Sequence, residues 1–520
     1  MAESKTKLKP LPDVGDIIFL LVTQLPLFAL PMFLFSDGST GWHLFTGNYI
    51  LANGIPHHDI ISYTFPDKQW VAYQWLFDVV AAVLVKVGGL YLLAVAASAS
   101  IGFIFLLLYD RCRKEGGGLA LVVSLCIIGA IVSAIHWLAR PHLFVFFGVY
   151  LFSTALEDFY RGTIKAARLF ICLTLYMVIW VNAHPAFLLA YVLISIYLAC
   201  ALFQWWRSHE PEKRREFKSK AVILASLLAS CAALSLVNPY GLQLYQYIFN
   251  YLSAGIVLAN TQEFNSPVFH GNLQPSALEI LFALMFVGFY ASGKKKITLP
   301  TFISCLVFGH LTLNAVRNMP LFVIVAAPAI AKMWPAYTPS TNSEESGAAP
   351  WWNKALAWWH QKASDFSETE NECKMHLLPL MFVIAMVIAS VSGGSLMGHK
   401  LLQNGFDPKH FPTATLKAIS ENKLSADHGF TFDNWGGYIR YFAGIPVFID
   451  DRADFYGEPF YQEYGRVSLT IPGWQEILDK HKIDWILFPN NSKLVAALKE
   501  SKNWRELSHD EAASLYVRKP

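Results

Sequence analysis

Long apolar runs follow one another along most of the chain up to residue 393. A helix needs about 17–25 mostly apolar residues to cross a bilayer, and about eleven runs approach or reach that length. They lie at residues 15–35, 89–109, 118–136, 142–157, 167–182, 186–206, 221–237, 276–291, 298–313, 319–334 and 376–393. The pattern predicts a mainly α-helical, polytopic membrane bundle with about eleven transmembrane helices.

From about residue 394 the pattern changes. Helical periods lie near residues 412–422, 458–466 and 492–500. Short strand-like runs alternate with them, at Gly429–Phe432, Val447–Asp450, Trp485–Phe488 and Ser514–Val517. This alternation is typical of a compact α/β domain. We therefore expect a membrane domain over 1–393 and a small soluble α/β domain over 394–520.

Residues 70–88 decide the predicted topology, because this stretch is apolar enough either to cross the bilayer or to lie on it. Cytoplasmic loops of membrane proteins carry an excess of Lys and Arg. If the stretch does not cross, one side collects Lys5, Lys7, Lys9, Arg111, Arg113, Lys114, Arg161, Lys165, Arg168, Lys213, Arg214, Arg215, Lys218, Lys220, Lys294, Lys295 and Lys296. We therefore expect a cytoplasmic N-terminus, a first outer loop over 36–88 with membrane-lying helices, and a C-terminal domain outside.

The composition supports a membrane protein and excludes other classes. Charged residues make up 15% of the 520 residues and hydrophobic ones 54%, whereas soluble domains carry about 25% charged residues. The net charge of +3 is too small to indicate a nucleic-acid-binding surface. The seven cysteines form no Cys-x-x-Cys pair, so we expect neither a zinc site nor a disulfide framework.

With this topology the unusual polar side chains gather on the outer side. They are Asp37, His43, His58, Asp59, Gln74, His136, Arg140, His142, Asn182, His184, Asn238, Glu263, Asn314, Arg317, Asn318, Asp450, Asp451, Arg452 and Asp454. Ionisable residues near a membrane indicate a functional site by default, so five converging loops predict an active site at the membrane–water boundary. Structural alternatives stay open: Asp37 suits a helix N-terminus, and Arg140 can snorkel or cap a helix end.

A divalent metal is one interpretation of the acids in the C-terminal domain. Asp450, Asp451 and Asp454 supply the hard oxygen ligands that such ions prefer. Arg452 lies among them and would repel a cation or pair with the carboxylates. The pattern therefore favours a salt-bridged loop, and the predicted site residues include no metal ligand.

A series of short phrases, in order along the chain, carries a resemblance to a known family. The phrases are Gly41-Trp42-His43-Leu44, Thr46-Gly47, Ile55-Pro56, Asp59, Ser62-Tyr63-Thr64, Ala139-Arg140-Pro141-His142, Trp180-Val181-Asn182-Ala183-His184, Asn238-Pro239-Tyr240-Gly241, Glu263-Phe264, Arg317-Asn318-Met319-Pro320, Trp435-Gly436-Gly437-Tyr438 and Phe448-Ile449-Asp450-Asp451-Arg452-Ala453-Asp454. Over nearly its whole length the chain resembles the glycosyltransferase superfamily C, and more narrowly a group of uncharacterised bacterial members. Relatives tend to carry an acid where this chain has Ser39, and His-Gly where it has His184-Pro185.

The resemblance implies an integral membrane enzyme that takes a sugar from a polyprenyl-phosphate donor and inverts it at the anomeric carbon. A carboxylate would assist the attacking acceptor; Asp37 is the first candidate for this catalytic role and Asp59 the second. Arginine holds a phosphate in a bidentate fork, so Arg317, then Arg140, are the candidates for binding the donor phosphate.

The remaining predicted site residues would bind substrate. They are His43, His58, His142, His184, Glu263, Asn318, Arg452 and Asp454. The implied partners are the polyprenyl-phosphate-linked sugar, membrane lipid, and a glycan, lipid or protein acceptor, with no nucleic acid. No cofactor is certain, and a divalent metal stays an option.

The implied location is a bacterial inner (plasma) membrane, with the N-terminus cytoplasmic and the C-terminal domain periplasmic. Two other functions remain open. A transporter of a lipid-linked precursor would want polar groups at mid-membrane depth and inverted repeats, whereas here the charges gather at one face. A non-catalytic scaffold on the same fold is favoured by the loss of an acid at Ser39.

Overall fold

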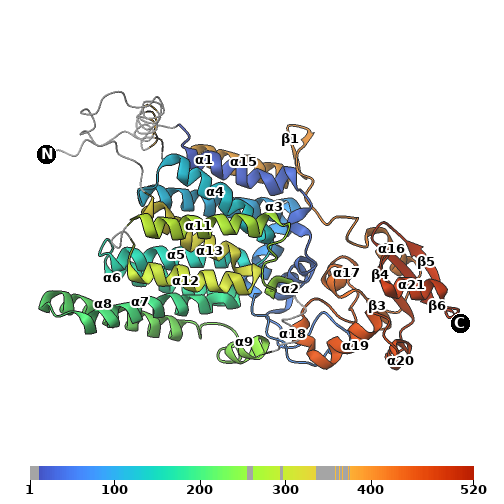
Figure 1. The fold of residues 1–520 in the computed structure, drawn as a ribbon. Coiled ribbons are helices and arrows are strands. Elements are labelled where there is room, and N and C mark those ends of the chain that lie inside the picture. The colour runs from blue at the N-terminus through green and yellow to red at the C-terminus, as the bar shows by residue number, and fades with distance from the viewer. Residues whose placement is uncertain are drawn as a thin grey trace.

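A bundle of long helices makes up most of the computed structural model, which describes residues 11–253, 262–292, 297–334 and 375–519, with residues 358, 362, 366, 370 and 373 between them. Figure 1 shows the bundle helices side by side, with the C-terminal part against one end. The bundle helices are α1 (Val14–Gln24), α3 (Trp75–Lys114), α4 (Leu119–Ser133), α5 (His142–Tyr160), α6 (Ala166–Ala183), α7 (Leu188–Arg207), α8 (Pro211–Leu234), α11 (Leu273–Ser292), α12 (Leu299–Asn314), α13 (Met319–Met333) and α15 (Leu377–Val391).

Every predicted apolar run falls on one of these helices, which confirms the mainly helical membrane fold. Among the described residues, eight helices are long and apolar enough to cross a membrane. Three shorter apolar helices, Val14–Ala29, Leu299–Asn314 and Leu377–Val391, coincide with the other predicted runs. Length and composition therefore support about eight spans directly, and the count of eleven stays a prediction.

Helix α3 is interrupted where the sequence predicted the change from outer loop to span. Gly88 and Gly89 leave the helical conformation, and Gly89 has φ +64° with ψ −169°. Residues with a Cβ rarely adopt that combination, so glycine permits the kink. The kink separates residues 75–87 from residues 90–114. That residues 75–87 lie on the membrane surface stays a prediction.

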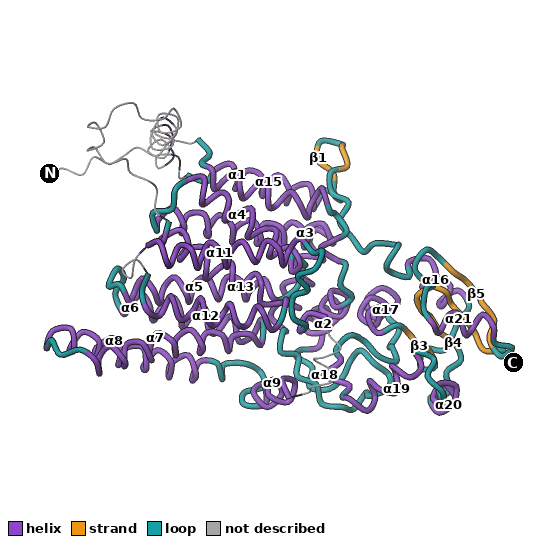
Figure 2. Tube along the Cα trace, viewed as in Figure 1, coloured by secondary structure: helices purple, strands orange, loops and turns teal. Residues whose placement is uncertain are grey.

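A four-stranded sheet forms the centre of the C-terminal domain. Its order is β3 (Gly429–Thr431), β4 (Trp485–Pro489), β6 (Ala513–Arg518) and β5 (Trp504–His509), with β3 parallel to β4 and the other pairs antiparallel. Figure 2 shows these strands apart from the helical bundle. The surrounding helices are α16 (Thr413–Glu421), α17 (Gly436–Ala443), α18 (Ala453–Tyr456), α19 (Glu458–Ser468), α20 (Trp474–Lys480) and α21 (Lys493–Glu500). This β-containing domain confirms the predicted class, while its boundary at residue 394 stays a prediction.

Two details of the predicted sheet are wrong. The run Val447–Asp450 is not one of its strands; Val447 instead forms an isolated parallel bridge with Ser62 in the first loop. The apolar run is buried against that loop rather than in the sheet. Strand β5 was missed because its edge position leaves most of its residues polar and only partly buried.

Glycines allow the first loop and the C-terminal domain to approach backbone to backbone. Helix α2 (Ser39–Asn53) lies between the bundle and α17 (Figure 1). A Cβ on Gly41 would lie 2.5 Å from the carbonyl carbon of Gly437, and a Cβ on Gly437 would lie 2.5 Å from the Trp42 nitrogen. The phrase that begins at Gly41 and the phrase that contains Gly437 thus pack against each other. This contact holds the C-terminal domain against α2.

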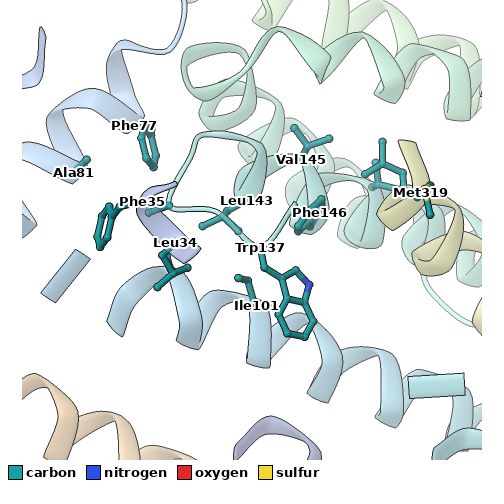
Figure 3. Packing of buried hydrophobic residues seen from close by; sticks show 14 of the residues in the cluster. Leu34, Phe35, Phe77, Ala81, Ile101, Trp137, Leu143, Val145, Phe146 and Met319 are labelled. Carbon is teal, nitrogen blue, oxygen red and sulfur yellow. The ribbon is translucent and has the colours of Figure 1, made fainter. Parts of the chain in front are cut away.

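The apolar core beneath α2 positions the two loops that matter most for function. Leu34, Phe35, Trp137 and Leu143 pack in one buried cluster, in which Figure 3 shows them close together. Leu34 also accepts a backbone hydrogen bond from Ala139 at 3.0 Å. The residues that follow, from 36 onward and from 140 onward, are therefore held side by side at the end of the bundle.

Candidate active site

Arg140 joins two acids from different loops. Its Nη1 donates to Asp37 Oδ2 at 2.9 Å and to Glu263 Oε1 at 2.7 Å. Asp37 precedes α2, Arg140 precedes α5, and Glu263 lies in the short helix Gln262–Phe264. Three of the predicted site residues thus form one charged group.

Asp37 has a local role as well. Its Oδ1 accepts from the backbone nitrogen of Ser39 at 2.8 Å, close to the start of α2. A carboxylate is favourable there because the first backbone N–H groups of a helix have no partner within the helix. Asp37 therefore has the predicted position at a helix N-terminus, and it also forms an ion pair with Arg140.

The charges in this group reinforce one another. Burial opposes ionisation of Glu263, but Arg140 and Arg317 outweigh it and hold the Glu263 pKa below its ordinary value. Burial likewise opposes the charge on Arg140, and Asp37, Glu263 and Asp451 more than compensate, so the Arg140 pKa is raised. Both side chains are thus held in their ionised forms.

Arg317 lies on the other side of Glu263. Its guanidinium carbon lies 4.4 Å from the ring centroid of Phe264, in the range of a cation–π contact. Its segment, Val316–Asn318, is tied to the Glu263 segment because the Val316 nitrogen donates to the Asn265 oxygen at 3.0 Å. Arg317 is part-exposed and lines the cavity, and it also hydrogen-bonds with the side chain of Tyr251.

One cavity contains six of the predicted site residues. Its lining is Gln74, His136, Arg140, Pro141, His142, Val145, Phe146, His184, Ala186, Leu189, Glu263, Arg317, Asn318 and Leu321. The five predicted outer loops therefore do meet at one place, at the end of the bundle that faces the C-terminal domain. The individual roles of these residues stay predictions.

The cavity histidines are held by backbone groups. The Nε2 of His142 lies 2.6 Å from the carbonyl oxygen of His136, and the Nδ1 of His184 accepts from the Ala186 nitrogen at 3.0 Å. Burial, followed by Arg317 and Arg140, lowers the pKa of His184 well below its ordinary value. His184 is therefore neutral and suited to hydrogen bonding rather than to holding charge.

His43 and His58 do not line this cavity. His43 is a buried residue of α2; its Nδ1 lies 2.5 Å from Asp78 Oδ1, and the centroid of its ring lies 3.7 Å from that of Trp42. His58 is exposed and forms a backbone bridge with Gln69. Their geometry gives them structural contacts, and their predicted binding roles stay untested.

Asp59 and Arg452 meet in a buried joint between the first loop and the C-terminal domain. Arg452 Nη2 donates to Asp59 Oδ1 at 2.8 Å and to Asp450 Oδ2 at 2.7 Å. The other Asp59 oxygen accepts from the nitrogen and the hydroxyl of Ser62. This is the salt-bridged loop that the sequence favoured, and we do not retain Asp59 as a candidate base.

Two acids of the C-terminal domain, Asp450 and Asp454, already have protein partners. Asp450 is occupied by Arg452 and by the hydroxyl of Tyr456, and Asp454 accepts from the hydroxyl of Tyr247. In the described part of the chain, the grouping of three or more His, Cys, Asp or Glu that is close enough for a shared ion is Asp13, Asp16 and His376. It involves α1 and α15 and no residue of the cavity.

The predicted site residues omitted Gln74 and His136 of the cavity lining, and they also omitted Asp451. Asp451 acts electrostatically on Arg140, and its Oδ1 is buried without a hydrogen-bond partner. In the sequence Asp451 lies between Asp450 and Arg452, and no local feature separates it from Asp450. The two acids differ only in the structure, where Asp450 pairs with Arg452, which in turn pairs with Asp59.

No protein-family model and no curated protein sequence matches the chain. Among solved structures, the archaeal oligosaccharyltransferase AglB from Archaeoglobus fulgidus, in complex with an inhibitory peptide and a dolichol-phosphate, matches with a TM-score of 0.51 and 11% identity over 97% of this chain and 74% of that one. The apo form of the Archaeoglobus fulgidus oligosaccharyltransferase matches with a TM-score of 0.54 and 11% identity over 92% and 69%. The chain therefore has the glycosyltransferase-C fold of these membrane oligosaccharyltransferases.

Proposed function

We propose that the protein is a membrane glycosyltransferase that moves a sugar from a polyprenyl-phosphate donor to an acceptor, with inversion at the anomeric carbon. The observation that carries the proposal is the cavity in which Arg140, Glu263 and Arg317 meet. It lies at one end of a bundle whose fold resembles that of an oligosaccharyltransferase solved with a dolichol-phosphate. Fold alone does not imply function, so the argument depends on the site.

The donor phosphate would bind between Arg140 and Arg317. Only Nη1 of Arg140 makes the two ion pairs described above, and its Nε is buried without a partner. An unmade hydrogen bond on a buried charged group is costly, so this atom favours an anionic ligand. As the bond to the sugar breaks, the two guanidinium groups would stabilise the charge that develops on the leaving phosphate.

The lipid chain would lie in an apolar groove beside Arg140. The groove runs between α3 and the start of α5 and is lined by Leu93, Ala97, Ala139, Leu143 and Phe147, among others. Because Ala139 directly precedes Arg140, one ligand can place its phosphate on the arginine and its chain in the groove.

Glu263 would accept hydrogen bonds from the sugar. Its remaining acceptor capacity faces the cavity that it lines, and its low pKa keeps it an acceptor throughout the physiological range. Asp37 orients Arg140. A cavity at one end of the bundle favours an enzyme over a transporter, which needs its site near the bilayer midplane.

The proposal is tested by sugar transfer in proteoliposomes. The purified full chain receives a radiolabelled polyprenyl-phosphate-linked hexose, and host-cell membranes supply the acceptor. Arg317→Ala is expected to lower transfer by at least tenfold, while Arg466→Ala, at an exposed position of α19, leaves it unchanged. Equal activity of wild type and Arg317→Ala, or no transfer by wild type with any such donor, contradicts the proposal.

A further inference from the structure

The two acids paired with Arg140 already have hydrogen-bond partners. Asp37 accepts from the Ser39 nitrogen with one oxygen and from Arg140 with the other. Glu263 is paired with Arg140, and its pKa is held below the ordinary value after burial is outweighed by Arg140 and Arg317. A carboxylate whose oxygens already accept hydrogen bonds from an arginine or the backbone is a weak proton acceptor, so neither acid is free to act as the base.

Asp451 is brought to the site by two fixed neighbours. Asp450 is fully buried and binds Arg452, and Arg452 extends this contact to Asp59 in the first loop. The backbone on either side of Asp451 is therefore anchored to the membrane domain. A buried joint of this kind holds the intervening side chain in place.

Close packing brings the same loop beside Asp37. The Gly38 nitrogen donates to Asn434 Oδ1 at 3.3 Å, and a Cβ on Gly38 would lie 1.7 Å from the Asn434 backbone oxygen. Two residues later, a Cβ on Gly436 would lie 2.6 Å from the Asp450 Cβ. The loop with Asp37, residues 434–436 and the loop with Asp451 are thus stacked in that order.

We propose, on the basis of the function proposed above, that Asp451 is the catalytic base. Its unpartnered Oδ1 would accept the proton of the acceptor's hydroxyl or amide as that group attacks the anomeric carbon. The bond from the attacking atom to the anomeric carbon forms, and the bond from that carbon to the phosphate oxygen breaks. The lipid phosphate leaves with the electron pair, on Arg140 and Arg317, and the proton stays on Asp451.

The electrostatic surroundings suit this role. Five ionisable groups interact electrostatically with Asp451: Asp37 ahead of α2, Arg140 ahead of α5, Asp450 on its own loop, Asp433 on the segment before α17, and Tyr461 on α19. Burial first, then Asp37 and Asp450, raise its pKa well above the ordinary value, against the pull of Arg140. Once ionised, a carboxylate with a raised pKa is a stronger base than one whose pKa is lowered, as that of Glu263 is.

The test compares Asp451→Asn and Asp451→Glu with wild type in the proteoliposome assay, as a function of pH. Wild-type kcat is expected to fall as the pH drops and Asp451 is protonated. Asp451→Asn should lower kcat by about 10²–10⁴-fold and abolish that fall, while Asp451→Glu restores at least a tenth of wild-type activity with its fall at a different pH. Melting temperatures report whether each variant folds.

A second measurement separates this role from donor binding. Asp451→Asn should bind polyprenyl-phosphate within threefold of wild type, whereas Arg317→Ala should bind it at least tenfold more weakly. Transfer by Asp451→Asn within threefold of wild type, or a loss of activity matched by an equal loss of binding, overturns the assignment of Asp451 and leaves the proposed function standing. A wild type that transfers no sugar overturns both.

Discussion

Arg140 and Glu263 are joined at 2.7 Å although they belong to loops that follow different helices. Glu263 is also influenced by Arg317 from a third loop. These contacts hold the cavity in shape, and they connect the helical bundle to the chemistry that we propose.

Replacing Glu263 should lower stability in a pH-dependent manner. Its pKa is lower in the folded protein than the ordinary value of 4.5, so its ionisation stabilises the fold above about pH 4.5 and ceases to do so as the pH falls towards the folded pKa. Glu263→Gln should therefore melt below wild type at pH 7, with a smaller difference at pH 4. The exposed Glu476→Gln is the control; a difference for Glu263→Gln that grows on acidification contradicts the account.

Removing Arg452 should loosen the C-terminal domain. Arg452→Met leaves Asp59 and Asp450 buried without their partner, which costs about 3–5 kcal/mol for a buried pair. We expect faster proteolytic cleavage between the domains and a lower melting temperature, while exposed Arg466→Met leaves both unchanged. Unaltered proteolysis of Arg452→Met would show that the joint does not hold the domain.

The contact between α2 and α17 should not tolerate a methyl group. Gly41→Ala would place a Cβ 2.5 Å from the backbone of Gly437, so the helices must separate. Gly465→Ala is a matched control in α19, since no atom lies within 4 Å of the added Cβ and alanine favours a helix by about 1 kcal/mol. Thermal unfolding should show a loss for Gly41→Ala and none for Gly465→Ala; equal melting temperatures contradict the proposed packing.

The two ends of the bundle should face opposite sides of the membrane. Arg111, Arg161 and Lys332 cluster with acids at one end, whereas Arg140 and Arg317 lie at the end beside the C-terminal domain. We predict that the basic end is cytoplasmic. A protease added to intact spheroplasts should remove the C-terminal domain; protection there, with cleavage only after lysis, would reverse the topology.

The sequence predicted most of the helices and the meeting of the outer loops, because hydrophobic runs and isolated charges are local signals. It failed where the answer depended on contacts between distant segments. The run at Val447 was predicted to be a sheet strand, whereas Val447 forms a bridge with Ser62 in the first loop. The ion pair between Asp59 and Arg452 also joins segments that are far apart in the sequence. Asp451 was not among the predicted site residues, because no feature of the neighbouring sequence distinguishes it from Asp450.

A structure of the protein with a polyprenyl-phosphate bound is the most direct test of the central claim, that the cavity holds the donor phosphate. The account predicts the phosphate within hydrogen-bonding distance of Arg140 and Arg317, with the lipid chain in the groove beside Ala139 and Leu143. A phosphate bound at the opposite end of the bundle, or a chain directed away from that groove with both arginines unengaged, would contradict it.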